Sequence, residues 1–279
     1  PGVSCLCEIA RVLWFLGYPD QALQRSQAAL TLAQKLSDLF SLSYALIFAA
    51  GLHQLRREGQ MTQRRAEEGI ALAREHGFTS LVSAGTIRRG WALAEQGHEE
   101  EGLLQMQQGL TARQTAGAEL AQPYFLALQA EIHNKLGRQE QATTLLTEAL
   151  TAMSTGKEHR LEAELHPLEG ELTLQQEDRD WRLETSPASP QAPSLKSQVS
   201  EAVERRAEEC FLKALAVAKQ QQAKSLELRA TVSLARLWQS QGKQHTTRNT
   251  LSEIYHWFTE GFDTKDLQEA KALLEALNP

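Results

Sequence analysis

Five side chains between residues 162 and 171 have the types that bind metals or transfer protons. They are the carboxylates and imidazole of Glu162, Glu164, His166, Glu169 and Glu171. Glu162 and His166 are four residues apart and would share one face of a helix, whereas Glu164 and Glu171 would project elsewhere. Because metal ligands must converge on one point, the spacing favours a solvated acidic helix face. We therefore predict no metal site and no catalytic residue in this segment.

Other motifs with chemical potential are incomplete. The stretch 85–90, Gly-Thr-Ile-Arg-Arg-Gly, has the glycines of a phosphate-binding loop but not the Lys-Ser/Thr pair that must reach the phosphates and the metal. The sequence contains no His-Glu-x-x-His zinc motif and no Gly-x-Ser-x-Gly nucleophile motif. Cys5, Cys7 and Cys210 form no pair of ligand clusters, so we expect them to be core thiols of a reducing compartment. The chain is thus predicted not to be an enzyme.

Charge and hydropathy exclude further classes. The net charge is −6 and the isoelectric point is about 5.8, which argues against a nucleic-acid partner. The stretch 39–55 contains no Asp, Glu, Lys or Arg, but it is too short and too polar to span a bilayer. The sequence begins at Pro1-Gly2 without a signal peptide, so we expect a cytoplasmic fragment of a longer protein with no membrane partner.

The elements that must position these residues are helices, and they repeat. Ala, Leu and Gln dominate the composition, while β-branched runs are scarce. Small residues recur at steps of 40, at Ala10, Ala50, Gly90, Ala130 and Gly170. Further columns at the same step contain small residues (Ala29, Gly69, Gly109, Ala149) and turn glycines (Gly17, Gly97, Gly137), with Gly59 displaced by two places. Each row of 40 predicts two helices around a glycine turn.

The frame breaks once and then resumes. Adding 25 residues after about position 178 restores the columns at Ala207, Ala214, Ala235 and Gly242. The added segment contains three prolines and few apolar residues, so we predict a flexible insertion loop over 178–202. A single domain over 1–279 then holds six helix pairs and a capping helix over 263–277. The pairs are expected near 3–40, 41–80, 81–120, 121–160, 161–223 and 224–261.

This arrangement resembles the tetratricopeptide (TPR) pattern. A small residue lies in the middle of the first helix, glycine lies at the turn, and small residues seven apart lie in the second helix, as at Ala22 and Ala29. The period of 40 exceeds the usual 34 of that family, so the helices should be longer. The resemblance implies an all-α, right-handed α-solenoid whose neighbouring repeats share one core.

Longer strings resemble a particular group of TPR proteins. They are FAAGLHQLRRE (48–58), GWALAEQG (90–97), QAKSLELRATVSLARLWQSQGK (222–243) and YHWFTEGFDTKDLQEAKALLEAL (255–277). They are similar to the C-terminal TPR region of bacterial signalling proteins that join a class III adenylate or guanylate cyclase to an AAA/STAND-type ATPase. The resemblance implies a non-catalytic interaction arm that regulates those modules. ATP and Mg²⁺ would then bind only in upstream domains, and no cofactor is expected in this chain.

The expected binding surface is the concave face formed by the first helix of each pair. Aromatic and arginine side chains, which often carry interface energy, occur at its inward positions. The candidate binding residues are Arg11, Tyr44, Arg88, Trp91, Tyr124, Glu131, Asn134 and Arg236, with Trp14 and Glu171 at equivalent places. The aromatic residues could instead fill gaps between repeats. The partner is predicted to be a protein or peptide, including the ATPase and cyclase modules themselves, and the alternative is a small-molecule inducer in the groove.

Overall fold

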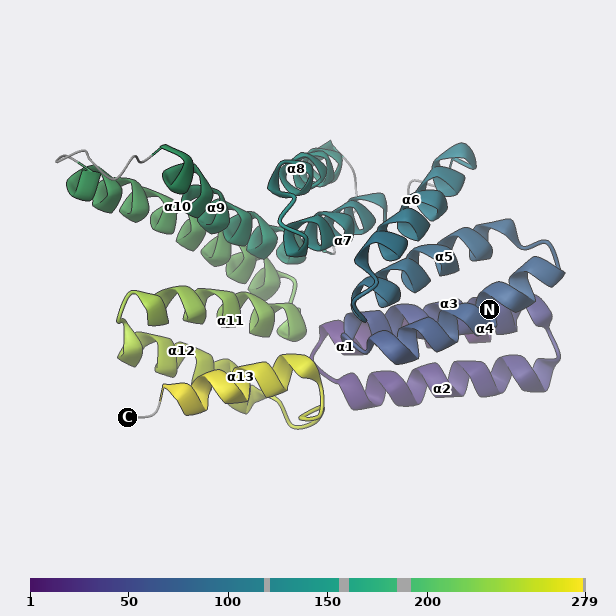
Figure 1. Cartoon of the computed structure of the whole chain (residues 1–279). Coiled ribbons are helices and arrows are strands. Elements are labelled where there is room, and N and C mark those ends of the chain that lie inside the picture. Colours follow the sequence, from purple (N-terminus) through teal and green to yellow (C-terminus); the bar gives the residue numbers. More distant parts are fainter. Residues whose placement is uncertain (118–120, 156–160, 185–191, 278–279) are drawn as a thin grey trace.

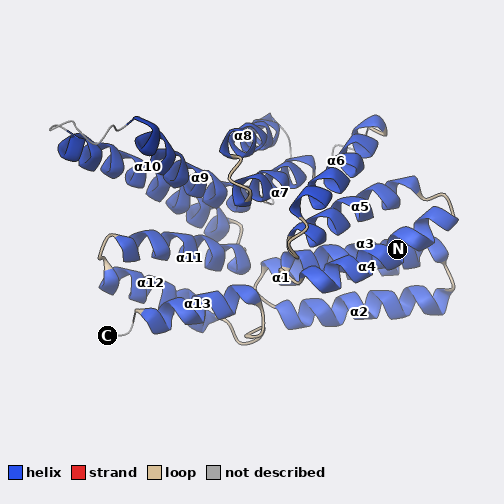
Figure 2. Cartoon of the chain, in the orientation of Figure 1, coloured by secondary structure: helices blue, strands red, loops and turns tan. Residues whose placement is uncertain are grey.

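The chain is built entirely of helices wherever its structure is described. The computed structural model describes residues 1–117, 121–155, 161–184 and 192–277 (Figure 1). Those ranges contain thirteen helices and no strand (Figure 2). The all-α prediction is therefore confirmed. No helix in the described ranges is long and apolar enough to cross a bilayer.

Twelve of the helices form six consecutive pairs, and in each pair the two helices pack against each other. The helices are α1 (Gly2–Phe15), α2 (Pro19–Leu36), α3 (Leu39–Leu55), α4 (Gly59–Glu75), α5 (Thr79–Ala94), α6 (Glu99–Thr115), α7 (Gln122–Lys135), α8 (Gln139–Thr155), α9 (Glu162–Glu184), α10 (Ala192–Gln220), α11 (Lys224–Ser240), α12 (Gln244–Trp257) and α13 (Lys265–Ala276).

The small-residue columns lie where helices approach most closely. Ala10, Ala50 and Ala130 are at most 2% exposed. A Cβ added to Gly90 would stand 2.5 Å from the carbonyl oxygen of Gly102, and the reverse contact has the same distance. The backbones of α5 and α6 thus touch at a point where no side chain fits. This close approach explains why the column requires small residues.

The turn column is also visible in the backbone, with one correction. Gly17, Gly97 and Gly137 have positive φ values between 72° and 91°. In the second pair, however, the left-handed residue is Arg57, with φ 61°, and Gly59 is the first residue of α4. Our prediction that a displaced Gly59 makes this turn is therefore wrong. The residue 40 positions after Gly17 is Arg57, and it adopts a backbone conformation that normally favours glycine.

The predicted 25-residue loop is largely helical. Helix α9 continues to Glu184 and α10 begins at Ala192, so 178–184 and 192–202 lie in helices. Only 185–191 lies between them, and it falls outside the described residues. Pro193 does not oppose the helix because it stands in the first turn of α10, where the missing amide proton has no intrahelical acceptor.

The final helix packs on the sixth pair, as predicted. Phe258, Leu267 and Ala270 share a buried cluster with Leu228 and Leu251 of α11 and α12. Helix α13 begins at Lys265, two residues after the predicted start at 263, and its N-cap residue is Thr264.

The C-terminal end of the array folds back onto the first pair. In Figure 1 the yellow segment before α13 lies beside the purple turn between α1 and α2. The Glu260 carboxylate accepts hydrogen bonds from the amides of Asp20 and Gln21, at 2.9 and 3.0 Å. These amides belong to the first turn of α2, which has no side-chain cap of its own. Glu260 therefore caps a helix about 240 residues away in the chain.

Close packing supports these polar contacts. A Cβ on Gly17 would stand 2.6 Å from the Trp257 ring, and one on Gly261 would stand 2.1 Å from Pro19. The Ser225 hydroxyl donates to the carbonyl oxygen of Trp14 at 2.5 Å. We call the contacts of 14–21 and 55–57 with 224–229 and 257–269 the closure interface. It joins the two ends of the helical array.

Candidate functional site

The inner face of the array follows a simple rule of sequence position. The six rows begin at residues 1, 41, 81, 121, 161 and, after the 25 added residues, 226. Within each row, positions 4, 8, 11 and 15 are three or four residues apart and share one face of the first helix. Apart from Ser4 and Ser240, every residue at these positions in α1, α3, α5, α7, α9 and α11 lines one of two cavities. The helical period thus carries the side chains of all six first helices to one interior surface.

The two cavities differ in size and in wall. The central cavity, about 530 Å³, lies among α5, α7, α9, α11 and α13. The arginine cavity, about 1140 Å³, lies among α1, α3, α5 and α7 and is named for its three arginines. Gln54 and Tyr124 line both. The inner face therefore contains two chambers that adjoin at Gln54 and Tyr124.

The predicted binding residues all reach these chambers. Arg11, Tyr44 and Arg88 line the arginine cavity, Tyr124 lines both, and the central cavity takes Trp91, Glu131, Asn134 and Arg236. Trp14 does not line either cavity. It is 2% exposed and belongs to a core cluster, with the Arg229 guanidinium 4.9 Å from its ring centroid. The packing alternative therefore applies to Trp14 and also to Trp91, which is 4% exposed and belongs to a core cluster, although Trp91 and Tyr124 also line cavity walls.

An ion-pair network crosses the central cavity at the closure interface. Asp266 of α13 lies 2.9 Å from Arg229 of α11 and 3.4 Å from Arg57 at the end of α3. Arg57 also donates to Glu269 at 2.7 Å, and Arg229 also pairs with Glu164 of α9. Burial raises the pKa of Glu164, and the charge of Arg229 opposes that rise. These five residues tie four helices together through charge-assisted hydrogen bonds.

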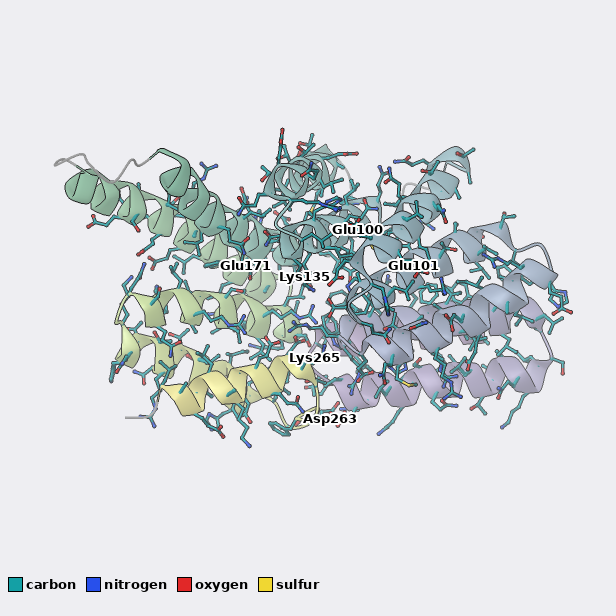
Figure 3. All side chains as sticks on the ribbon, in the orientation of Figure 1. Glu100, Glu101, Lys135, Glu171, Asp263 and Lys265 are labelled. Atoms are coloured by element: carbon teal, nitrogen blue, oxygen red, sulfur yellow. The ribbon has the colours of Figure 1, made fainter. Side chains whose placement is uncertain are left out.

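A second group of charges lies on α7 and α9. Lys135 pairs with Glu131 at 3.1 Å and also with Glu95 of α5. Glu171, labelled with Lys135 in Figure 3, accepts a hydrogen bond from Ser233 at 3.3 Å. Burial raises the pKa of Glu171, and the nearby charge of Glu131 adds to this effect. Glu171 is thus a carboxylate in an unfavourable electrostatic environment within the cavity wall.

In the arginine cavity the key side chain is Arg88. Its Nη1 donates to the carbonyl oxygen of Ala84 at 2.9 Å, and its Nε is inaccessible to solvent and has no acceptor among the described residues. Burial lowers the pKa of Arg88 to about 10, and the charges of Arg113 and Arg11 act in the same direction. A Cβ at Gly51 would stand 2.8 Å from Arg88 Nε, so glycine at this inner-face position makes room for the guanidinium.

Aromatic rings line the same cavity as that guanidinium. Arg88 and Arg113 lie 5.8 and 5.7 Å from the centroid of the Phe125 ring. The Tyr44 and Phe48 rings stack at 4.2 Å, and both residues line the cavity. The cavity therefore combines cationic groups with flat apolar surfaces, a combination typical of sites for organic ligands.

The acidic segment of α9 does not converge on a metal site. His166 is 2% exposed and lies 3.2 Å from Glu169 and 3.7 Å from Glu162. Glu164 and Glu171 instead line the central cavity, so the prediction of a solvated acidic face is wrong for these two residues. Among the described residues no group of three His, Cys, Asp or Glu side chains could hold a metal ion.

The remaining candidate motifs have structural explanations. Gly85 and Gly90 lie inside helix α5, where a Cβ would stand 2.6 and 2.5 Å from neighbouring atoms, so 85–90 is not a loop. Cys7 is buried, and burial raises the pKa of its thiol to about 12. Cys210 is half-buried. Cys5 is exposed, so the prediction of a core thiol is wrong at that position.

Sequence reasoning missed the residues of the ion-pair network. Glu164 and Arg229 occupy inner-face position 4, the position of the selected Tyr44 and Tyr124, and that register could have identified them. Arg57 could have been noticed as a non-glycine in the turn column. Asp266 lies outside the repeat and has no periodic signal. Only the fold-back of α13 brings it to Arg57 and Arg229.

Comparison with known proteins found no matching family model and no similar curated protein.

Proposed function

We propose that this chain is a right-handed, TPR-like α-solenoid that acts as a non-catalytic regulatory arm of a bacterial signalling protein. The 40-residue columns of small residues support the TPR-like assignment, because each column recurs at the same helix contact. The observation that carries the regulatory role is the closure interface. It joins the two ends of the array next to an inner face that has the character of a ligand site.

The proposed mechanism is a change in how the ends meet. Each helix pair contacts its neighbours, so a small rotation per pair adds up over six pairs. The closure interface combines an apolar cluster, which includes Trp14, Leu55 and Leu226, with hydrogen bonds and ion pairs, and these polar contacts can exchange partners more readily than packed side chains. A ligand that binds better to one arrangement of the inner face would shift the equilibrium between closed and open arrays. The partner protein would respond to whether the closure interface is formed.

The proposed partners are the ATPase and cyclase modules of a longer cytoplasmic protein. This part of the proposal rests on the strings 90–97 and 255–277 and their resemblance to cyclase-associated TPR regions. The cofactors of such a protein, ATP and Mg²⁺, would bind in those modules and not in this chain.

The test of the regulatory role is a distance measurement across the closure interface. Donor and acceptor dyes are placed at the exposed Gln24 of α2 and Glu253 of α12, in a Cys5→Ser background. Asp266→Ala should lower the energy transfer between them because it removes the carboxylate shared by Arg57 and Arg229. The same substitution in the full-length protein should change nucleotide hydrolysis or cyclic-nucleotide formation. Altered energy transfer with unchanged output would contradict regulation through this interface.

A second candidate function is small-molecule sensing, and the shape of the interior favours it. The inner face contains chambers of about 530 and 1140 Å³, a size on the scale of small-molecule sites. Calorimetric titration with metabolites, compared with binding of the isolated ATPase module, separates the two functions. A substitution that fills one of the chambers distinguishes the outcomes. If it abolishes the binding of a metabolite, the result supports sensing. If it leaves the binding of the ATPase module unchanged, the result supports a protein-interaction role.

A further inference from the structure

The two cavities have opposite charge. The walls of the arginine cavity contain three arginines, Arg11, Arg88 and Arg113, and one glutamate, Glu8. Those of the central cavity contain six carboxylates and four cationic side chains. Neighbouring chambers of one inner face therefore differ in the sign of ligand that they favour.

Arg88 is a half-buried cavity side chain with no ion pair to any described residue. Arg11 pairs with Glu8, while Arg88 bonds only to the carbonyl oxygen of Ala84, and its Nε is inaccessible to solvent. Partial removal of a guanidinium from water without an anionic partner is unfavourable, and two further arginines nearby increase that cost. Such an arrangement is unfavourable for the empty protein and becomes favourable when an anion enters.

The surroundings of Arg88 restrict the anion further. The flat guanidinium binds carboxylate or phosphate oxygens in pairs. The Phe125 ring lies within 5.8 Å of the guanidiniums of both Arg88 and Arg113, and Tyr44 and Phe48 provide a stacked aromatic wall. An inorganic ion would leave most of the 1140 Å³ unfilled, so the ligand should also carry an apolar or aromatic body.

We propose that the arginine cavity is a binding site for a small organic anion, with a carboxylate or phosphate held by Arg88 and an aromatic or apolar body placed against Tyr44, Phe48 and Phe125. This inference deepens the sensing function proposed above and rests on it for its biological role. It assigns the class of ligand and the residue that recognises it.

The first test is calorimetric titration of the chain with phenyl phosphate and with 3-phenylpropanoate, and benzyl alcohol serves as the neutral analogue. At least one anion should bind, and benzyl alcohol should bind at least tenfold more weakly. A preference between the two anions identifies phosphate or carboxylate as the recognised group. Absence of binding by both anions, or equal binding of the neutral analogue, would overturn the proposal.

Two adjacent arginines provide a matched pair of variants. Arg88→Gln should weaken anion binding at least tenfold, because it removes a charge-assisted contact. Arg89→Gln makes the same change in net charge on the same helix, but Arg89 pairs with Glu67 away from the cavity, so binding should stay within twofold of the parent. Equal effects of the two substitutions would show a general electrostatic attraction and would refute a site at Arg88.

Stability measurements without ligand distinguish a binding residue from a structural one. If the role of Arg88 is to bind an anion, the melting temperature of the Arg88→Met variant without ligand should be no lower than that of the parent. The variant should also lose the stabilisation that phenyl phosphate gives to the parent. A large fall in melting temperature would mean that Arg88 is required for folding and would contradict the proposal. Ala84→Leu gives a second route, since it fills the cavity from a half-buried position and keeps the arginines; it should abolish anion binding.

The dye pair across the closure interface separates this inference from the proposed function. Anion binding that requires Arg88 but leaves energy transfer unchanged would support the site and contradict the regulatory mechanism. If energy transfer responds to Asp266→Ala but neither anion binds, the regulatory mechanism stands and the anion site is refuted.

Discussion

Single residues in this chain depart from their repeat columns where they contact a distant segment. Arg57 stands where Gly17, Gly97 and Gly137 make the same turn, and its φ of 61° is unfavourable for a residue with a side chain. Its guanidinium reaches Asp266 and Glu269 of α13, which a glycine could not do. At Gly51 a glycine stands where the other rows have a larger side chain, and this leaves room for Arg88. The exceptions to the repeat therefore mark the closure interface and the arginine cavity.

Backbone strain at Arg57 can be measured separately from its ion pairs. Arg57→Ala and Arg57→Gly both remove the contacts with Asp266 and Glu269, but only glycine adopts positive φ without strain. We expect the glycine variant to be more stable than the alanine variant by about 1 kcal/mol in chemical denaturation. Equal stability of the two variants would show that Arg57 does not keep this backbone conformation in solution.

Glu171 should make the stability depend on pH in an unusual direction. Because burial raises its pKa, the folded state binds this proton more tightly than the unfolded state, and the contribution to stability increases as the pH falls through the folded-state pKa. Glu171→Gln should therefore raise the melting temperature at pH 7, and the difference from the parent should shrink at lower pH.

Glu100 provides the control of opposite sign. Its hydrogen bond with Arg138 lowers the pKa of the Glu100 carboxyl, so its contribution is present at neutral pH and is lost as the pH falls. Glu100→Gln should lower the melting temperature at pH 7, by a small amount because the pair is exposed. Melting curves between pH 4 and pH 7, an interval chosen to span roughly the ordinary carboxyl range, compare the two variants. A Glu171→Gln variant that behaves like Glu100→Gln would contradict burial of Glu171.

At the scale of helices, the order of the array depends on how closely neighbouring backbones approach. Small residues in the first helix meet small residues in the second, as at Gly90 and Gly102 in α5 and α6. Larger side chains then interlock around these contacts, as Met106 and Ile87 do in the same pair, both less than 1% exposed. The small columns thus set the distance between helices, while the aliphatic residues provide most of the buried apolar surface.

The Gly102 contact gives a test with a definite sign. In an exposed helix Gly→Ala would stabilise by about 1 kcal/mol through helix propensity. At Gly102 the new Cβ would stand 2.5 Å from the Gly90 carbonyl oxygen, so we expect a net loss of about 1–3 kcal/mol. Gln108→Ala, at an exposed position of the same helix, should stay within about 0.5 kcal/mol of the parent. A stabilised Gly102→Ala variant would refute this packing of α5 on α6.

At the scale of the whole molecule, the array is closed by interactions between its two ends. Arg56 is 1% exposed at this interface, where it donates to Glu58 and to the Pro19 carbonyl oxygen and lies 3.7 Å from both Asp20 and Asp263. Lys265, labelled in Figure 3 with Asp263, lies 3.9 Å from Glu95, the C-cap residue of α5. Closure therefore involves several polar contacts, and some of their residues, such as Glu95 and Asp266, also line the central cavity.

Asp266 is the residue on which this closure depends most directly. It is 8% exposed and bridges Arg57 and Arg229, so Asp266→Ala leaves two cations without a shared partner. We expect a loss of about 3 kcal/mol in the free energy of unfolding. Glu275→Ala breaks an exposed pair with Lys271 on the same helix and should cost less than about 0.5 kcal/mol. Comparable losses for both variants would show that Asp266 has no special role in closing the array.

The sequence by itself determined the helices, their pairing and the residues of the inner face. These properties follow from local spacing, because positions three and four apart share a helix face and a 40-residue step repeats each contact. This spacing alone predicts Arg11, Tyr44 and Arg88 as residues of the inner face. The same local reasoning failed at 178–202, where composition suggested a loop but residues 178–184 and 192–202 lie in helices.

Only the tertiary structure decided that the ends meet. Glu260 caps α2 across about 240 residues, and Asp266 reaches Arg57 across 209. Such contacts have no periodic signal, because they depend on the sum of small rotations between successive helix pairs and not on any local pattern. The division of the inner face into two chambers of opposite charge has the same origin. Repetition sets each neighbouring contact, whereas the accumulated curvature of the array determines which distant residues come together.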